Sequence, residues 1–394
     1  MTIWIIEPRD PLIARDGRPF GPDPGARAST LPFPPPSAIV GGLRHKAGMD
    51  ADGRFDGSPA TIERIKQLLL RGPILAELED ETDAVRQFLF PAPADAIVFE
   101  PAGSSGEVDP VRILRLAPRE LPTKVVTNMP DGLQPVMPAR RVPDKVSSRA
   151  PRFWHQSAFE HWLLNPQEDL STTLDELGIT GLDQDARMHV SVRPETQTAR
   201  EGALFQTRGL EFTWRDRKAQ QREEAFVTRR LGLAATFEDE TGAYTSPHFS
   251  GGFAPLGGER RLMRRKTVDM TLPAPPDGLI DRVITEQRAR VILITPAVFR
   301  EGYRPPLAWK RGGVTAEIKA AAVPRAQVIS GWDLHLGKPR QTRRLAPAGS
   351  VYFIEWPAGV DVRAWIDATW MQNISDNEQD RRDGFGLAVL GVWA

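Results

Sequence analysis

The chain has 394 residues, its 51 lysines and arginines are balanced by 51 aspartates and glutamates, and it contains no cysteine. This length is greater than one hydrophobic core usually supports, and at roughly 150 residues per domain it predicts two or three domains. We expect two, with insertions. Zero net charge excludes a nonspecific nucleic-acid binder with a long-range field, and the lack of cysteine excludes disulfides, thiolate nucleophiles, iron–sulfur clusters and zinc sites with cysteine ligands.

The N-terminal residues predict a strand rather than a leader or a membrane span. Residues 3–6 are β-branched or aromatic and stop before Pro8, which is typical of a first strand. This apolar run is too short for a signal peptide, and no later stretch approaches 18 consecutive apolar residues. We therefore expect a cytoplasmic protein.

A proline-rich entry, TLPFPPPSAIVGGLRHK, follows a loop rich in turn signals. Its prolines hold the chain extended, and Ser37 is the predicted N-cap of a helix over residues 38–47. Gly41 and Gly42 together should cost this helix roughly 2 kcal/mol relative to alanine, so we expect something to approach the bare backbone. Two interpretations remain open: a tightly packed helix with a solvated basic end, or a platform for an anion with Arg44 as ligand.

Periodicity and capping signals predict the remaining elements. Further helices are expected at residues 58–70, with Ser58 as N-cap, and at residues 154–164, 171–177, 279–287 and 360–371. Further strands are expected at residues 74–79, 85–90, 96–100, 189–193, 204–214, 225–237, 290–295, 326–332, 351–355 and 387–393. Residues 101–153 lack periodicity and carry a basic cluster, which predicts an insertion or a protruding hairpin.

The order of these elements predicts an α+β fold. It fits two ferredoxin-like, or RRM-like, βαββαβ domains with long loops rich in glycine and proline. The N-terminal domain is expected at residues 1–214, with the basic insertion at 101–153, and the C-terminal domain at residues 215–394.

The sequence offers little catalytic chemistry. The six histidines show no metal-ligand spacing, so we expect no metal, and no Walker A sequence, GxSxG elbow or kinase motif occurs. The stretch GFGLAVLG at residues 384–391 lacks the third glycine of a dinucleotide fingerprint and precedes a strand, so no dinucleotide cofactor is expected. His45 beside Arg44 leaves open a general base for metal-free RNA cleavage.

Glycine-rich loops beside arginines recur along the chain. The most basic stretch is HFSGGFAPLGGERRLMRRK at residues 248–266. Such loops let backbone N–H groups and guanidinium groups approach phosphates closely. An arginine cluster alone is usually solvated surface, but several on a neutral chain favour a shaped groove for a polyanion.

Six stretches, in order, resemble one family. They are DPLIARDGRPF (10–20), LPFPPPSAIVGGLR (31–44), TAREGALFQTRGLEF (198–212), GFAPLGGERR (252–261), ISGWDLHLGKPRQTRRLAPAGSVYF (329–353) and GFGLAVLG (384–391). The sequence resembles the third Cmr subunit of type III-B CRISPR complexes, a member of the RAMP superfamily.

This resemblance implies a noncatalytic subunit of an antiviral, RNA-guided complex. It implies two ferredoxin-like domains whose glycine-rich loops bind the 5′ handle of the crRNA. The implied partners are the crRNA, the large polymerase-like Cmr subunit, the adjacent backbone RAMP subunit and, indirectly, target RNA. It also implies few aromatic residues of the RNP type, so base stacking in the RRM manner is not assumed. Residues 101–153 are a hypothetical thumb between guide and target.

The candidate RNA-binding residues combine the family's motif positions with the basic clusters. They are Arg15, Arg18, Gly41, Gly42, Arg44, Lys46, Arg141, Lys145, Gly257, Gly258, Arg260, Arg261, Lys338, Arg340 and Arg343. Two alternatives remain. One is a metal-independent RAMP endoribonuclease that processes crRNA with His45 as base, and the other is a scaffold that touches only protein.

Overall fold

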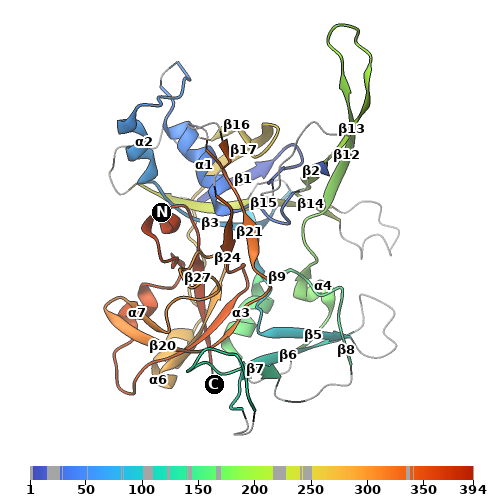
Figure 1. Cartoon of the computed structure of the whole chain (residues 1–394). Helices are drawn as coiled ribbons and strands as arrows, with labels where there is room; N and C mark the ends of the chain where they lie inside the picture. Colours follow the sequence, from blue (N-terminus) through green and yellow to red (C-terminus); the bar gives the residue numbers. More distant parts are fainter. Residues whose placement is uncertain are drawn as a thin grey trace.

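The computed structural model folds the chain into two large sheets with smaller sheets beside them (Figure 1). It describes residues 3–15, 27–28, 30–50, 52–80, 82, 84–100, 110–121, 125–138, 140, 144–165, 170–215, 228–239, 242, 251–333, 338–339 and 341–393. Within these ranges the helices are α1 (Pro36–Ala47), α2 (Pro59–Lys66), α3 (Gln156–Leu164), α4 (Leu174–Leu177), α6 (Leu279–Glu286), α7 (Arg363–Asp367) and α8 (Glu378–Arg382). The protein is a mixed α/β structure made mostly of strands.

The first sheet is built around the N-terminal strand β1 (Ile3–Pro8). In the described part of the chain its order is β11-β9-β4-β3-β15-β1-β17-β16, and β14 pairs with β15. These strands are β3 (Leu69–Leu78), β4 (Val85–Pro91), β9 (Phe153–His155), β11 (Gly178–Ile179), β14 (Thr213–Arg215), β15 (Thr228–Glu238), β16 (Gly252–Leu256) and β17 (Arg261–Val268). Four adjacent strands of this sheet follow the order β17-β1-β15-β3, all antiparallel.

Helix α1 covers one face of this sheet. Ile39 and Val40 pack in the same cluster as Ile6 of β1 and Leu233 of β15. The helix begins at Pro36, with Pro35 at the N-cap position and no side-chain capping bond. The predicted N-cap at Ser37 is therefore wrong, because the proline run itself enters the first turn, where a missing N–H costs nothing.

Helix α2 confirms its predicted start and corrects its predicted end. The Ser58 hydroxyl accepts a hydrogen bond from the Thr61 backbone N–H at 3.3 Å, as expected of an N-cap. The helix ends at Lys66 rather than near residue 70, because β3 begins at Leu69 and pairs there with Glu238 of β15. Sheet pairing with a strand far along the chain outweighs local helix propensity at this point.

The second sheet belongs to the C-terminal part of the chain. Its order is β19-β20-β25-β18-β27-β26. The strands are β18 (Arg288–Leu293), β19 (Ala308–Arg311), β20 (Val314–Ala322), β25 (Val351–Glu355), β26 (Gln372–Asn373) and β27 (Leu387–Val392). Four of them follow the order β27-β18-β25-β20, again antiparallel, and α7 lies between β25 and β27 in the chain.

Small sheets flank these two. The strands β5 (Ala96–Glu100), β6 (Val111–Pro118), β7 (Val136–Pro138), β8 (Lys145–Val146) and β10 (Leu170–Thr172) form one of them. Most described strands of the predicted insertion thus form a sheet with β5. The others are β12 (Gln184–Val192) with β13 (Ala199–Leu210) and β2 (Arg27–Ala28), β21 (Gln327–Ile329) with β24 (Arg343–Leu345), and β22 (Trp332–Asp333) with β23 (Lys338–Pro339).

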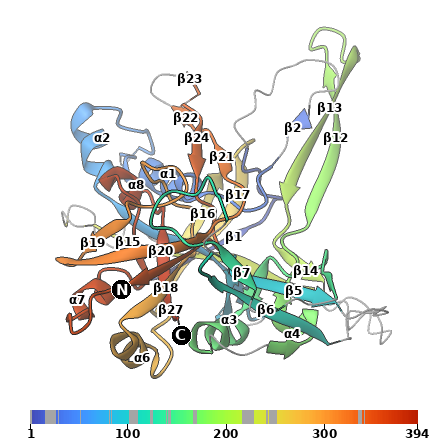
Figure 2. The same cartoon turned by 60° about the horizontal axis from the view of Figure 1, so that its bottom comes forward.

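Among the described elements, the β12–β13 hairpin projects from the body. It stands away from both sheets in two views that differ by a 60° rotation (Figures 1 and 2). Met188, Val190 and Leu204 of this hairpin are 62%, 44% and 55% exposed. Val190 lies directly opposite Leu204, so these side chains share one face of the ribbon.

One hydrophobic core joins the two large sheets. It contains Ile3 and Phe90 of the first sheet together with Phe353 and Val389 of the second. The first sheet needs β15 and β17, so it extends to Val268, beyond the domain boundary predicted at residue 214.

Candidate nucleic-acid interface

A short extended segment after β1 lies between several distant parts of the chain. Leu12 forms an isolated antiparallel bridge to Leu210, Ile13 bridges to Gly258, and Arg15 bridges to Thr30. These bridges bring three of the six family-like stretches together, although they are separated by up to 245 positions. The Leu31 backbone N–H, in a fourth stretch, donates to the Ala14 carbonyl oxygen at 2.7 Å. Backbone pairing between distant segments creates this junction, and no local sequence pattern predicts such pairing.

The remaining two stretches meet the same segment through a small apolar cluster. It consists of Ala14, Leu31, Ile329, Leu345 and Phe385, each 8% exposed or less. Ile329 and Leu345 come from the β21–β24 pair, and Phe385 comes from the GFG loop before β27. All six stretches therefore converge on residues 12–15.

The loop between β16 and β17 has a strained backbone at this junction. Gly257 has a φ of +70°, and a Cβ atom there would lie 2.5 Å from the Ile13 carbonyl oxygen. Glu259 and Arg260 follow with φ of +60° and +48°, a left-handed conformation that is costly for residues with a side chain. Two such residues in succession are typical of a site where the loop shape serves a function.

Two of the predicted arginines lie on the surface of this junction. Arg15 donates to Glu259 at 2.5 Å, and their side chains remain 44% and 47% exposed. Arg260 is exposed, and no described residue forms an ion pair or hydrogen bond with it. Arg261 is half-buried and its Nε has no hydrogen-bond partner. The geometry leaves Arg260 available to an anion.

Arg44, by contrast, is occupied within the protein. Its Nη1 donates to Asp383 at 2.6 Å, and its other nitrogens donate to the carbonyl oxygens of Ile65, Lys66 and Leu68 at 3.0–3.2 Å. The two charged side chains are only 14% and 12% exposed. Arg44 thus ties the end of α2 to the C-terminal part of the chain, which is a role in the fold.

The glycine pair of α1 also serves packing at one of its two positions. A Cβ atom on Gly42 would lie 3.1 Å from Leu256 Cδ1, so this glycine lets α1 approach β16. Gly41 is exposed, with nothing within 4 Å of an added Cβ. Lys46 is half-buried one turn after Gly42. The packed-helix interpretation therefore explains the glycine at position 42 but not the glycine at position 41.

The C-terminal candidates are described only in part. Arg343 donates to Asp380 of α8 at 2.6 Å, lies 5.2 Å from the Phe385 ring centre and is 38% exposed. Lys338 belongs to β23, but its side chain is not among the described ones. Arg18, Arg141 and Arg340 lie outside the described residues. Lys145 is exposed on β8, in the side sheet rather than at the junction.

The candidate base His45 and possible metal ligands were located in the described ranges. There, no group of three or more His, Cys, Asp or Glu side chains could hold a metal ion. The exposed His45 ring stacks on Phe55, with ring centres 5.2 Å apart. Among the described helices, none is long and apolar enough to cross a membrane.

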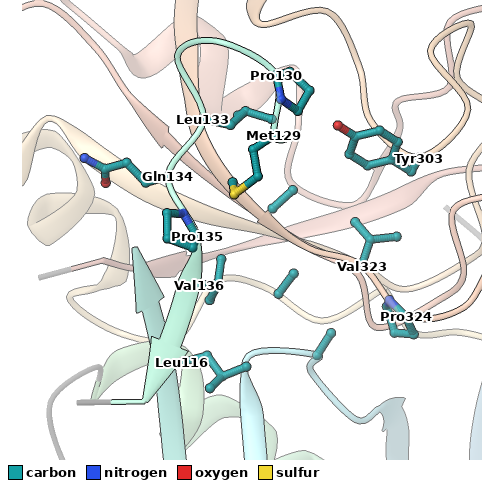
Figure 3. Close-up of a pocket in the computed structure, with 13 residues that line it drawn as sticks. Leu116, Met129, Pro130, Leu133, Gln134, Pro135, Val136, Tyr303, Val323 and Pro324 are labelled. Atoms are coloured by element: carbon teal, nitrogen blue, oxygen red, sulfur yellow. The ribbon is translucent and has the colours of Figure 1, made fainter. Parts of the chain in front are cut away.

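An apolar hollow lies elsewhere, between the 129–136 loop and the end of β20 (Figure 3). It encloses about 570 Å³ and is lined by Met129, Leu133, Val136, Tyr303 and Val323, among others. Such a lining suits an apolar side chain and not a phosphate. Neither this hollow nor the apolar face of the β12–β13 hairpin was predicted, although the alternation in AxMxVxV carries a signal for the latter.

The sequence and structure were compared with known proteins. Residues 4–393 match the model of a family described as CRISPR-associated protein (Cas_Cmr3), and no curated protein matches the sequence. A similar solved chain occurs in the Type III-B Cmr-beta complex bound to cognate target RNA, with 14% identity and a TM-score of 0.47 over 93% of this chain and 88% of that chain. Another occurs in the Type III-B Cmr-beta complex bound to cognate target RNA and AMPPnP (state 1), with 14% identity and a TM-score of 0.45 over 89% of this chain and 86% of that chain. A third occurs in the Csm3–Csm4 subcomplex of the type III-A CRISPR-Cas interference complex, with 11% identity and a TM-score of 0.37 over 89% of this chain and 92% of that chain.

Proposed function

The chain belongs to the Cas_Cmr3 family of CRISPR-associated proteins, and from this premise we propose that it is a noncatalytic subunit of a type III-B effector complex that binds the 5′ handle of the crRNA. The family match covers nearly the whole chain and confirms the resemblance seen in the six sequence stretches. The proposal places the protein in the cytoplasm and in antiviral defence.

The strand orders support the ferredoxin-like part of this proposal. Numbering the strands by their place in a βαββαβ unit, both β17-β1-β15-β3 and β27-β18-β25-β20 give the order 4-1-3-2. The first unit has helices α1 and α2 between its first two strands, and the second has α7 between its last two. We propose two such units, with the first ending at Val268 rather than at residue 214.

The convergence of the six stretches on residues 12–15 carries the functional proposal. A junction made only for packing has no need of exposed arginines on a strained loop. Arg260 is exposed in a left-handed conformation next to Gly257 and Gly258, and Arg15 pairs with Glu259 of the same loop. Guanidinium groups held beside glycine backbone suit the closely spaced phosphates of an RNA strand.

The same proposal assigns protein partners to the apolar surfaces. We propose that the exposed apolar row of the β12–β13 hairpin and the hollow lined by Met129 and Tyr303 face the large polymerase-like subunit or the adjacent backbone subunit. Exposed apolar side chains in a row are typical of interaction sites. Among the described elements, this hairpin reaches away from the body (Figure 2).

Binding to a short RNA with the handle sequence tests the proposal. The full chain is titrated in EDTA at several salt concentrations, alone and in the assembled complex. We expect Arg260→Ala to lower the affinity and to reduce the salt slope by about one unit, because one phosphate contact is lost. Arg363→Ala is the control, since Arg363 lies on α7 and pairs with Asp367.

The outcomes separate the candidate functions. Binding without cleavage supports the noncatalytic assignment. A single cleavage product in EDTA would establish the endoribonuclease alternative, and His45→Ala would then abolish it. A chain that binds no RNA, alone or assembled, would leave a scaffold that touches only protein and would overturn the proposal.

A further inference from the structure

An acidic side chain stands in the loop to which the proposed function assigns RNA binding. Glu259 follows Gly257 and Gly258 in the turn between β16 and β17 and directly precedes Arg260. Its side chain is 47% exposed, and its backbone φ is +60°. A residue with a side chain adopts this left-handed conformation at a cost that glycine does not have. An acid held at this cost in a loop for a polyanion needs a role of its own.

Arg15 fixes the position of this carboxylate. Its Nη2 donates to Glu259 Oε1 at 2.5 Å. A Cβ atom on Gly258 would lie 3.2 Å from Arg15 Nε, so the bare backbone of Gly258 makes room for the guanidinium group. Charge-assisted hydrogen bonds of this kind are strong and directional. Glu259 is therefore held in one orientation at the surface.

Most of the hydrogen-bonding capacity of Glu259 remains unused. A carboxylate has about four acceptor positions on its two oxygens. Within the described part of the chain, Arg15 is the one donor to Oε1, and no hydrogen bond or ion pair involves Oε2. A ligand that brings hydrogen-bond donors can reach these positions, because the side chain is half exposed.

The donors of an RNA strand lie on its bases and its ribose. Phosphates carry acceptors and negative charge, so a carboxylate repels them. Unpaired bases are recognised on their Watson–Crick edges, and the 2′-hydroxyl is the other donor. Guanine presents two adjacent donors on that edge, N1–H and the 2-amino group. Adenine, cytosine and uracil each have an acceptor beside the donor, which would face the second carboxylate oxygen.

We propose that Glu259 binds the Watson–Crick edge of one unpaired guanine in the bound RNA and so determines the sequence preference of this site. The two carboxylate oxygens match the two adjacent donors of the base, and Arg260 holds a neighbouring phosphate. The inference rests on the proposed RNA binding and deepens it by naming the base. Sequence reasoning used the glycines and arginines of GGERR and did not consider its glutamate.

A cation of a protein partner is the competing ligand of Glu259. The next two positions argue against it. Arg260 is exposed without a described partner, and the Nε of Arg261 is buried without an acceptor. These guanidinium groups would repel a second cation, whereas a nucleotide brings a phosphate for the arginines and donors for the acid.

Replacing guanosine by inosine tests the contact in the full chain. The probe is the handle RNA in which each guanosine in turn becomes inosine, which lacks the 2-amino group. We expect inosine at one position to weaken binding to the wild type by about tenfold, because one hydrogen bond to a charged group is lost. Glu259→Gln should lose this penalty, since its amide N–H₂ cannot accept from the 2-amino group. Asp367→Asn is the matched control: Asp367 is exposed and pairs with Arg363, so this variant should keep the penalty.

The proposed function and the guanine contact fail in different ways. If the wild type binds the RNA and Arg260→Ala weakens it, but no inosine does, the guanine contact is refuted and the proposed function stands. The same holds if Glu259→Gln keeps the inosine penalty, or if the handle contains no guanosine. If the wild type binds no handle RNA, alone or in the assembled complex, both proposals fail.

Three other results would give Glu259 a different role and also refute the inference. A penalty from 2′-deoxyguanosine, but not from inosine, that Glu259→Gln removes would mean that the carboxylate binds ribose. Tighter binding of every RNA by Glu259→Gln would mean that it only repels phosphate. Impaired assembly with protein subunits, with RNA binding and the inosine penalty unchanged, would mean that a protein cation occupies it. Urea unfolding of each variant confirms that the chain remains folded.

Discussion

Replacing Arg44 by alanine should destabilise the protein and leave RNA binding unchanged. Sequence reasoning favoured this arginine as an RNA ligand, because it follows a glycine pair in a motif shared with an RNA-binding family. In the structure, four hydrogen bonds hold its guanidinium group, three of them to carbonyl oxygens at the end of α2 and beyond. The chain itself supplies the partners that a phosphate would replace.

The expected cost follows from the groups that Arg44→Ala would leave without a partner. Asp383, 12% exposed, would lose its charged partner but keep a bond from Gln379, and three backbone carbonyl oxygens would lose a donor. Removing one partner of a largely buried ion pair costs about 3–5 kcal/mol, because the other charge stays desolvated. We expect a loss of about 3 kcal/mol, at the lower end of that range, because Gln379 continues to donate to Asp383.

Urea unfolding measures this loss, and a double-mutant cycle with Asp383→Ala assigns it to the pair. The coupling free energy should be about 1–3 kcal/mol. Arg363→Ala, which breaks an exposed pair on α7, should cost less than about 1 kcal/mol. The RNA affinity of the Arg44→Ala variant is then measured under conditions in which urea unfolding shows that this variant is folded. A variant of nearly wild-type stability with weaker RNA binding and a smaller salt slope would refute the reasoning.

Three further predictions use the same unfolding assay. Gly257→Ala should cost about 2 kcal/mol more than Gly53→Ala, because both glycines have a positive φ but only Gly257 has a carbonyl oxygen within 2.5 Å of an added Cβ. Asp95→Ala should lower the free energy of unfolding by about 3–5 kcal/mol, because it leaves the charge of Arg290 buried without its partner, and both side chains are 0% exposed. The double variant Asp95→Leu with Arg290→Met should lose less stability, because it removes both charges. Burial lowers the pKa of His155 below its ordinary value of 6.5 in the folded chain. As the pH drops below 6.5, His155 is protonated in the unfolded chain before it is protonated in the folded chain, so the free energy of unfolding should fall. The His155→Gln variant should show a smaller loss of stability over the same pH range.

Elements with local signals were predicted well. The first strand, the strands at residues 85–90 and 96–100, the helix at 279–287 and the final strand all occur within two residues of their predicted ends. Each is marked by alternation, by a continuous apolar run or by turn residues at its ends, and these signals act within a few residues.

Elements that depend on distant partners were missed. Strand β17 reads RLMRRKTV, and its arginines suggested only a basic segment, yet it lies in the first sheet between β1 and β16. Strand β20 was not predicted either, because its alanines and alternating charges carry a weak strand signal. The predicted helix at 360–371 shortened to Arg363–Asp367. Tertiary pairing decides each of these segments.

The candidate site shows the same division between local and distant information. The sequence does not distinguish an arginine that pairs within the fold from one that stays available to a ligand, since both kinds lie near glycines. Arg44 and Arg343 each meet a carboxylate of the 380–383 segment at 2.6 Å, whereas Arg260 meets no described carboxylate. Both outcomes are compatible with zero net charge, because that balance says how many counter-charges exist and not where they lie.

The position of a carboxylate in the folded chain therefore separates structural arginines from binding arginines. Where the fold supplies an acid at hydrogen-bond distance, the guanidinium group joins two parts of the protein, and a phosphate would have to displace that acid. Where the described surroundings hold no such acid, as at Arg260, positive charge remains for a ligand.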